Sequence, residues 1–141
     1  MAKGDINNPM NIRDTHIKWL GENDIPGDEF DDFISPEYGF RAGFVLLYHY
    51  IKHGYNTLAE IITRYAPPED NNPTEEYIRN VSDWSMIDWN SQIDVERYIS
   101  LAVRIVSAMA RQEQGTIPDP IDVDLGFQLF MNDYFPANET L

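Results

Sequence analysis

The sequence of 141 residues contains no cysteine, which excludes disulfide bonds and metal sites with thiolate ligands. Basic residues are scarce as well, because 10 lysines and arginines stand against 24 aspartates and glutamates, for a formal net charge of −14. Binding to nucleic-acid phosphates needs a basic face, and an anionic membrane surface attracts basic rather than acidic proteins. We therefore expect no nucleic-acid partner, and the charge favours association with a basic partner.

Long hydrophobic runs are also missing. No apolar stretch reaches the ~18 residues that a membrane-spanning helix needs, so no membrane insertion is predicted. Residues 1–13 are polar and hold no apolar run of the kind that signal peptides carry, so the protein is expected to live or be assembled in a cytoplasm. The sequence has no phosphate-binding loop and no dinucleotide fingerprint, and no cofactor is predicted.

Aromatic residues make up 13% of the chain, which is high for so acidic a protein and argues against disorder. The length is close to the most common domain size, so one domain is expected. We assign that domain to residues 1–115. Residues 116–141 are rich in proline and then in aromatic residues, and we predict a tail that docks a short helix on this domain or on a partner.

Residues 36–53 are predicted to form the central helix. Ser35 suits the N-cap, proline is well placed at the first helical position, and Gly54 suits a left-handed residue just beyond the helix. Apolar residues lie almost all round this helix, which predicts that protein surrounds it. Gly39 and Gly43 each cost about 1 kcal/mol of helix propensity relative to alanine. That cost is understandable if another backbone or a ligand crosses the helix there.

Further helices are predicted at 57–66, from residue 72 onward, and at 94–114, where capping residues and apolar spacing agree. Short apolar stretches at 16–20 and 29–34 predict two strands, which form a small flap before the central helix. The predicted fold is therefore mainly α (α+β), with a β flap near the N-terminus.

Two groups of residues have the composition of a metal or acid–base site, and each has a simpler interpretation. Residues 22–37 hold seven carboxylates, which suits a cleft edge or a divalent-cation site, or else a solvated acidic flap. His49 and His53 have the spacing that lets two imidazoles share a metal. We favour a solvated flap, a surface histidine and a histidine that interacts with the helix end, so no metal is predicted.

Arg41 is a charge on an otherwise apolar helix. A buried arginine needs a carboxylate partner, and Glu37 lies four residues earlier on the same helix. We predict that these two residues form a structural ion pair.

An ordered string of short motifs runs through residues 7–82. The motifs are Asn8-Pro9-Met10-Asn11-Ile12-Arg13, Trp19-x-Gly21, Phe33 with Ser35-Pro36-Glu37-x-Gly39-x-Arg41-Ala42, Gly54-x-x-Thr57, Ile61-Ile62-x-Arg64-Tyr65-Ala66-Pro67-Pro68-Glu69-x-Asn71 and Thr74-x-x-Tyr77-Ile78. This string resembles a family of phage and prophage proteins that are described as virion structural proteins, some of them tied to a lysozyme-like, peptidoglycan-degrading protein.

The resemblance implies a lysozyme-like helical domain in a protein of the virion, assembled in the cytoplasm of the bacterial host. The implied partners are other virion proteins, with peptidoglycan as an alternative. The same order of motifs is similar to the second half of a glucosaminidase module, in which the Asn-rich turn follows a helix that bears the catalytic glutamate. Only about six residues precede that turn here, and Met10 replaces the glycine expected after Pro9.

With that helix missing, Glu37 is the best substitute for the acid of a glycosidase, and Glu69 is the next. A glycosidase acid must lie in a dry cleft beside the scissile oxygen. The resemblance implies that residues 37–41 form the floor of any such cleft, with Asn11 and Arg13 opposite.

Three functions follow from these observations. The leading hypothesis is a virion-associated structural protein with a non-catalytic lysozyme-like core. The alternatives are a muralytic glycosidase or lytic transglycosylase, with Glu37 or Glu69 as general acid, and a peptidoglycan- or glycan-binding module. The candidate ligand-binding residues are Asn8, Asn11, Arg13, Trp19, Arg41, Tyr65 and Tyr77.

Overall fold

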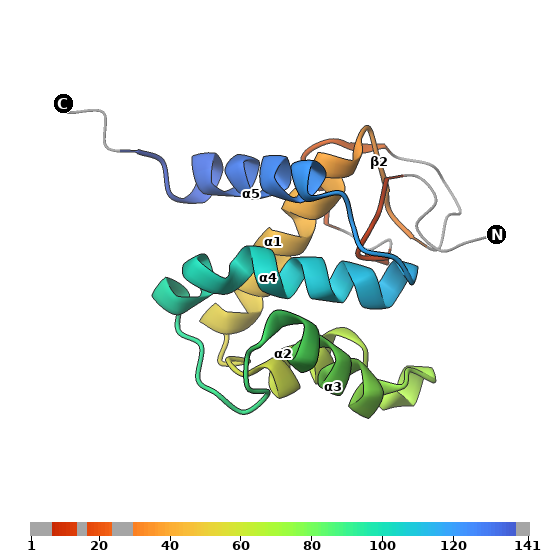
Figure 1. The fold of residues 1–141 in the computed structure, drawn as a ribbon. Helices are drawn as coiled ribbons and strands as arrows, with labels where there is room; N and C mark the ends of the chain where they lie inside the picture. Colours follow the sequence, from red (N-terminus) through yellow and green to blue (C-terminus); the bar gives the residue numbers. More distant parts are fainter. Residues whose placement is uncertain (1–6, 14–16, 24–29, 138–141) are drawn as a thin grey trace.

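Helix α1 (Pro36–Lys52) is the element on which α5, α4 and α2 pack. The computed structural model describes residues 7–13, 17–23 and 30–137, and Figure 1 shows α5 above α1 and the α2 and α3 pair below it. The predicted class, mainly α with a small β flap near the N-terminus, is confirmed. The other elements are β1 (Glu22–Asn23), β2 (Asp32–Phe33), α2 (Leu58–Tyr65), the 3-10 helix η1 (Pro68–Asp70), α3 (Thr74–Ser85), α4 (Val95–Gln114) and α5 (Pro120–Tyr134).

The signals at the ends of α1 act largely as predicted. Ser35 occupies the N-cap position with an extended backbone, although its side chain makes no capping hydrogen bond. Gly54 follows the helix with a φ of +95°, a left-handed conformation that glycine adopts without strain. Phe44 and Leu47 are fully buried on this helix. Protein therefore surrounds α1, as its apolar circumference predicts.

Both glycines of α1 mark the close approach of another segment. A Cβ at Gly39 would collide with the carbonyl oxygen of Asn7, and a Cβ at Gly43 would lie 3.0 Å from the Cγ of Met10. The N-terminal segment thus crosses α1 at these turns. The propensity cost of the two glycines is offset by the packing that they permit.

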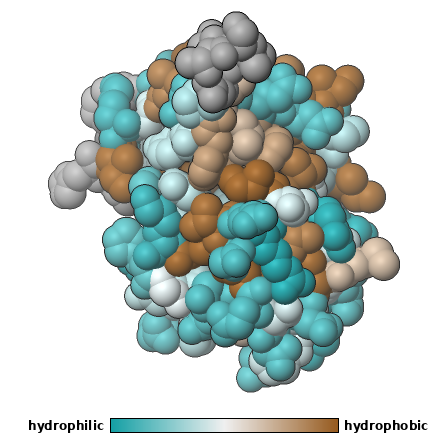
Figure 2. Space-filling view, turned by 90° about the vertical axis from the view of Figure 1, so that its left-hand side faces the viewer, coloured by the Kyte–Doolittle hydropathy of each residue, from teal (hydrophilic) through white to brown (hydrophobic). Residues whose placement is uncertain are grey.

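Helix α5 covers the outer side of α1. The ring of Phe130 on α5 stacks on Phe44 at a centroid distance of 6.0 Å, and the Tyr98 hydroxyl of α4 donates a hydrogen bond of 2.8 Å to the Phe44 carbonyl oxygen. These contacts join α1, α4 and α5 in one core. Figure 2 views the side where α5 ends, and hydrophobic atoms gather across the middle of that face.

Arg41 pairs with α5, so the predicted ion pair with Glu37 is wrong. The Nε and Nη2 atoms of Arg41 donate hydrogen bonds of 3.0 and 2.9 Å to Oδ2 of Asp133, which lies 92 residues away in the sequence. A pair between two helices satisfies the buried guanidinium and also ties α5 to α1.

The remaining helices begin and end close to the predicted positions. Thr57 caps α2 by accepting a hydrogen bond of 3.1 Å from the Glu60 amide. Asp94 caps α4 in the same way, with 2.8 Å to the amide of Arg97, and Gly115 ends α4 with a φ of +78°. Helix α3 packs between α2 and α4.

The flap differs in detail from the predicted hairpin. Strands β1 and β2 are antiparallel, with Glu22 opposite Phe33, and β2 falls inside the predicted strand at 29–34. The strand predicted at 16–20 is wrong where the structure describes it, because Trp19 enters a turn and its carbonyl oxygen accepts from the amide of Glu22 at 3.1 Å. Residues 14–16 and 24–29 lie outside the described part of the chain.

The acidic segment is only partly solvated. Asp31 and Asp32 are buried, with 2% and 6% of their surface exposed, which corrects the interpretation of 22–37 as a flap in solvent. In the described residues, no helix combines the length and the hydrophobicity that crossing a membrane would require.

Replacing Gly126 by alanine is expected to destabilise the protein. The new Cβ would lie 2.6 Å from the Cβ of Phe40 and 2.9 Å from the carbonyl oxygen of Glu37, so α5 has to move away from α1. Overpacking of this kind costs about 1–3 kcal/mol, although alanine recovers up to about 1 kcal/mol of helix propensity. Thermal unfolding followed by circular dichroism should show a Tm lowered by several degrees, whereas Asn132→Ala at an exposed position of α5 should not lower it. Equal Tm values for wild type and Gly126→Ala would contradict the close packing.

Candidate functional site

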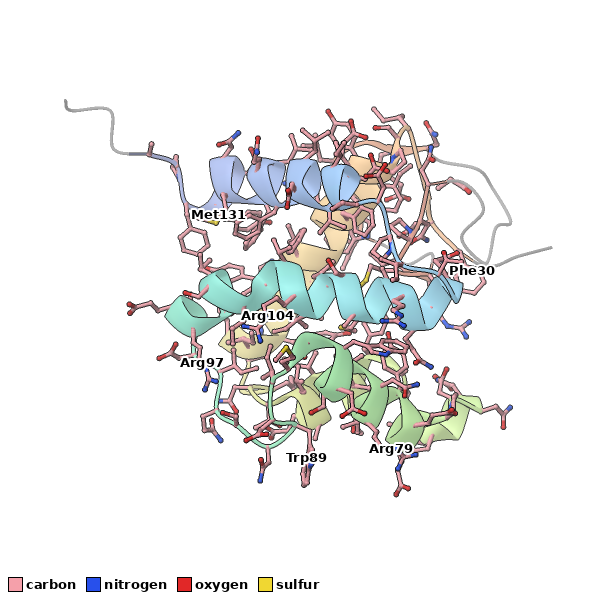
Figure 3. The ribbon with its side chains drawn as sticks, in the orientation of Figure 1. Phe30, Arg79, Trp89, Arg97, Arg104 and Met131 are labelled. Carbon is pink, nitrogen blue, oxygen red and sulfur yellow. The ribbon has the colours of Figure 1, made fainter. Side chains whose placement is uncertain are left out.

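A cleft of about 370 Å³ lies where the N-terminal segment meets the helices, and we call it the N-terminal cleft. One wall comes from the N-terminal segment and the flap, and the other comes from α1, the end of α2, η1 and the end of α4. Figure 3 shows Phe30 beside the C-terminal end of α4, at the opposite end of the view from Met131. The lining residues are Asn11, Ile12, Arg13, Ile17, Trp19, Phe30, Leu46, Tyr50, Arg64, Tyr65, Ala66, Pro67, Asp70, Asn72 and Glu113.

The Asn-rich turn positions the first wall. Asn8 is fully buried, and its Nδ2 donates to the carbonyl oxygens of Ile12 (2.9 Å) and Asp31 (2.8 Å), while its Oδ1 accepts from the amide of Ile12 at 2.9 Å. Asn11 has a φ of +51°, a left-handed conformation that asparagine tolerates better than most residues. Asn8 thus builds the turn and holds it to the flap, and Asn11 faces the cleft.

Glu113, in the last turn of α4, joins this turn to the helices. Its Oε1 accepts a hydrogen bond of 2.8 Å from Nδ2 of Asn11, and its Oε2 accepts one of 2.9 Å from the hydroxyl of Tyr77. Gln114 adds a bond of 3.2 Å from its Nε2 to Oδ1 of Asn11. Both oxygens of the carboxylate are therefore held by donors that come from different elements.

Two tyrosines lie against this network. The hydroxyl of Tyr65 donates to the carbonyl oxygen of Met10, so the end of α2 is also tied to the Asn-rich turn. Burial, and then the charge of Glu113, raise the pKa of both Tyr65 and Tyr77 well above its ordinary value. Both phenols therefore stay protonated as hydrogen-bond donors at neutral pH.

Two guanidinium groups stand at the mouth of the cleft. Arg13 and Arg64 are exposed, and they lie over the rings of Phe30 and Tyr50, at 5.4 and 5.7 Å from the ring centroids. Such contacts hold an arginine over an aromatic face. Two guanidinium groups thus line the cleft of a protein whose net charge is −14.

Of the seven residues predicted to bind a ligand, four line the N-terminal cleft. These are Asn11, Arg13, Trp19 and Tyr65. Tyr77 lies behind them and reaches the cleft through Glu113. The binding roles of these residues stay predictions. Asn8 and Arg41 hold segments together through the hydrogen bonds described above.

Neither acid that the sequence singled out lies in the cleft. Glu37 is in the first turn of α1, where α5 crosses it near Gly126, so residues 37–41 do not form the floor opposite Asn11. Glu69 is exposed on η1 and lines a different hollow. The predicted geometry of that floor is therefore corrected.

Glu113 was not singled out in the sequence, yet it is central to the cleft. The carboxyl end of a helix carries partial negative charge, so an acid in the last turn of α4 is unfavourable without nearby donors. This unfavourable charge at the end of α4 is the signal in the sequence that points to Glu113. The donors themselves come from positions remote in the sequence, and Asn11 is 102 residues away.

The two histidines of α1 do not form a metal site with a third ligand in the described residues, where no group of three potential ligands occurs. Nδ1 of His53 lies 2.7 Å from the carbonyl oxygen of His49, at the C-terminal end of the helix. Partial burial, and then the charges of Lys52 and His53, lower the pKa of His49. This arrangement agrees with a histidine that interacts with the helix end.

Comparison with known proteins places the chain among the proteins of bacteriophages. No family model matches it. One relative is Protein P5 of Pseudoalteromonas phage PM2, which is 36% identical over 128 residues that span 86% of this chain and 77% of the relative. The chain belongs to the family of this phage protein. The comparison supports the phage part of the resemblance, while the likeness to lysozyme stays a prediction.

Replacing Tyr77 by phenylalanine is expected to make the free energy of unfolding fall less steeply as the pH rises in the alkaline range. The phenol ionises near pH 10 in the unfolded chain and only above that in the folded protein, because the folded pKa is raised. Its contribution to the free energy of unfolding is therefore complete below about pH 10 and is lost as the pH rises towards the folded pKa. Thermal unfolding at about pH 8 and about pH 11 measures the slope, which is the change in stability between the two pH values.

The matched control is Tyr55→Phe, at an exposed site outside the cleft. The slope between the two pH values should change for Tyr77→Phe and stay as in the wild type for Tyr55→Phe. Identical slopes for all three proteins would contradict the raised pKa of Tyr77.

Proposed function

We propose that this protein is a component of the phage virion that binds a glycan strand of the host peptidoglycan in the N-terminal cleft. Membership of a phage protein family supports the virion location. The observation that carries the binding role is the lining of the cleft, where aromatic walls (Trp19, Tyr50, Phe30) stand beside an amide and two arginines. Ligand sites typically combine apolar walls with a few placed polar groups.

Charge supports peptidoglycan over a neutral glycan. The peptide groups of peptidoglycan carry carboxylates, which guanidinium groups bind through charge-assisted hydrogen bonds. Arg13 and Arg64 stand at the mouth of the cleft, where such groups would meet them. The acidic remainder of the surface disfavours adsorption of anionic polymers elsewhere.

Hydrolysis of the glycan is the second candidate function. Among the residues that line the cleft, Asp70 and Glu113 are carboxylates, and glycosidases use a pair of carboxylates. A general acid has to carry a proton, however, and both oxygens of Glu113 accept hydrogen bonds, which stabilise the ionised form. We therefore place binding first and cleavage second.

Arg13→Ala and Arg64→Ala are expected to weaken binding to purified peptidoglycan in a pull-down assay. Each substitution removes charge-assisted hydrogen bonds, which contribute about 1.5–3 kcal/mol and correspond to a loss of affinity of about tenfold or more. Binding of the wild type should also weaken at high salt, since the partners are charged.

The control for this assay is Arg79→Ala, because Arg79 is exposed on α3 and lies outside the cleft (Figure 3). It should bind as the wild type does. Equal binding by all three variants, or no binding by the wild type, would exclude the cleft as the glycan site.

Cleavage is tested separately by the clearing of permeabilised cells. If the protein hydrolyses the glycan, Glu113→Gln should abolish clearing, because glutamine keeps the shape of the side chain and cannot exchange a proton. Glu69→Gln and Glu37→Gln should clear at the wild-type rate, since neither residue lines the cleft. Binding without clearing by the wild type would leave the protein as a binding component, and clearing that survives Glu113→Gln would reject Glu113 as the acid.

A further inference from the structure

Helix α5 presents exposed aliphatic side chains on the side that faces away from α1. Ile121 and Leu125, one turn apart, expose 66% and 41% of their surface, and Ile117, just before the helix, exposes 73%. We call these three residues the α5 stripe. In Figure 1, α5 lies along the upper edge of the molecule, and no described element covers its outer side.

The buried contacts of α5 do not require this stripe. Val123, Gly126 and Phe130 are the buried residues of the helix, and they provide its packing against the core. Further along the exposed side, the helix has the polar residues Gln128 and Asn132 instead of aliphatic ones. The exposed aliphatic side chains are thus confined to the N-terminal half of α5, whereas the exposed residue at its other end, Tyr134, is aromatic, and this grouping is typical of a docking patch.

The charged residues next to the stripe in the sequence are all acidic. Asp119, Asp122 and Asp124 flank it, and no lysine or arginine follows Arg111 in the sequence. Asp122 has a raised pKa because of burial, then the nearby charge of Asp119, then that of Glu37. The repulsion between these carboxylates is reduced when a cationic group binds near them.

We propose that the α5 stripe is the docking surface for a basic amphipathic helix of another virion protein. An amphipathic helix lays its apolar face on exposed aliphatic side chains, and its flanking lysines or arginines meet the aspartates. A second copy of this chain is disfavoured because it would bring two acidic surfaces together, and an anionic membrane is repelled in the same way. The inference rests on the proposed virion location, whereas it does not depend on what the cleft binds.

The test uses a synthetic peptide of about 18 residues, or about five helical turns, made of leucine and lysine with the leucines on one face. A scrambled peptide of the same composition is the control for charge. Fluorescence anisotropy should give an affinity for the amphipathic peptide at least tenfold higher than for the scrambled one. The double variant I117S/I121S should lose at least tenfold in affinity for the amphipathic peptide.

Matched controls distinguish an effect of the α5 stripe from general effects of a substitution on the surface or on stability. Met86→Ser, at a side chain that is 83% exposed on another part of the surface, should bind the peptide within twofold of the wild type. I117S/I121S should keep the wild-type Tm, because both side chains are exposed. It should also bind peptidoglycan as the wild type does, while the arginine variants of the cleft should still bind the peptide.

Several outcomes would overturn the inference. These are absence of peptide binding by the wild type, equal affinity for both peptides, and unchanged binding by I117S/I121S. Sedimentation equilibrium that shows a dimer dispersed by I117S/I121S would assign the stripe to a second copy instead. Flotation with zwitterionic vesicles that depends on the stripe would assign it to a lipid surface.

Discussion

The close approach of the N-terminal segment to the backbone of α1 is the constraint on which the rest of the structure depends. The carbonyl oxygen of Asn7 lies where a side chain at Gly39 would have to be, and Met10 lies against Gly43. With this segment seated on α1, Asn8 can hold the turn to the flap and Asn11 can reach Glu113. A central helix without its two glycines would exclude that segment, and the cleft would lose one of its walls.

The parts of the fold that the sequence predicts are those with local causes. Thr57, Asp94 and Gly115 cap or end their helices through contacts a few residues away, so capping patterns locate α2 and α4. The same local reasoning predicts Glu37 as the partner of Arg41, and this prediction is wrong. Glu37 lies on the same helix, but the carboxylate that binds is Asp133, which only the packing of α5 on α1 brings near. Local patterns carry no information on such a pair.

In the cleft, too, features with local causes are predicted and those set by long-range packing are missed. The resemblance of the Asn-rich turn directs attention to Asn11, Arg13, Trp19 and Tyr65, and these four do share a cavity. The sequence offers Glu37 and Glu69 as the acids nearest to these motifs, and neither lines the cleft. In the structure, the end of α4 brings Glu113 to the turn from the far side of the chain. A long-range contact thus supplies the carboxylate for which short-range reasoning finds no position.

The contact between Asn11 and Glu113 also sets the point during synthesis at which the cleft can be completed. These residues are 102 positions apart, so the contact between them closes a loop that contains most of the chain. Helices α1, α2 and α3 can form from local contacts while the ribosome is still making α4. The cleft is completed only when the last turn of α4 has left the ribosome and Glu113 has paired with Asn11. A truncated chain that ends before that turn would therefore have α1, α2 and α3 but would lack the carboxylate that joins the Asn-rich turn to the helices.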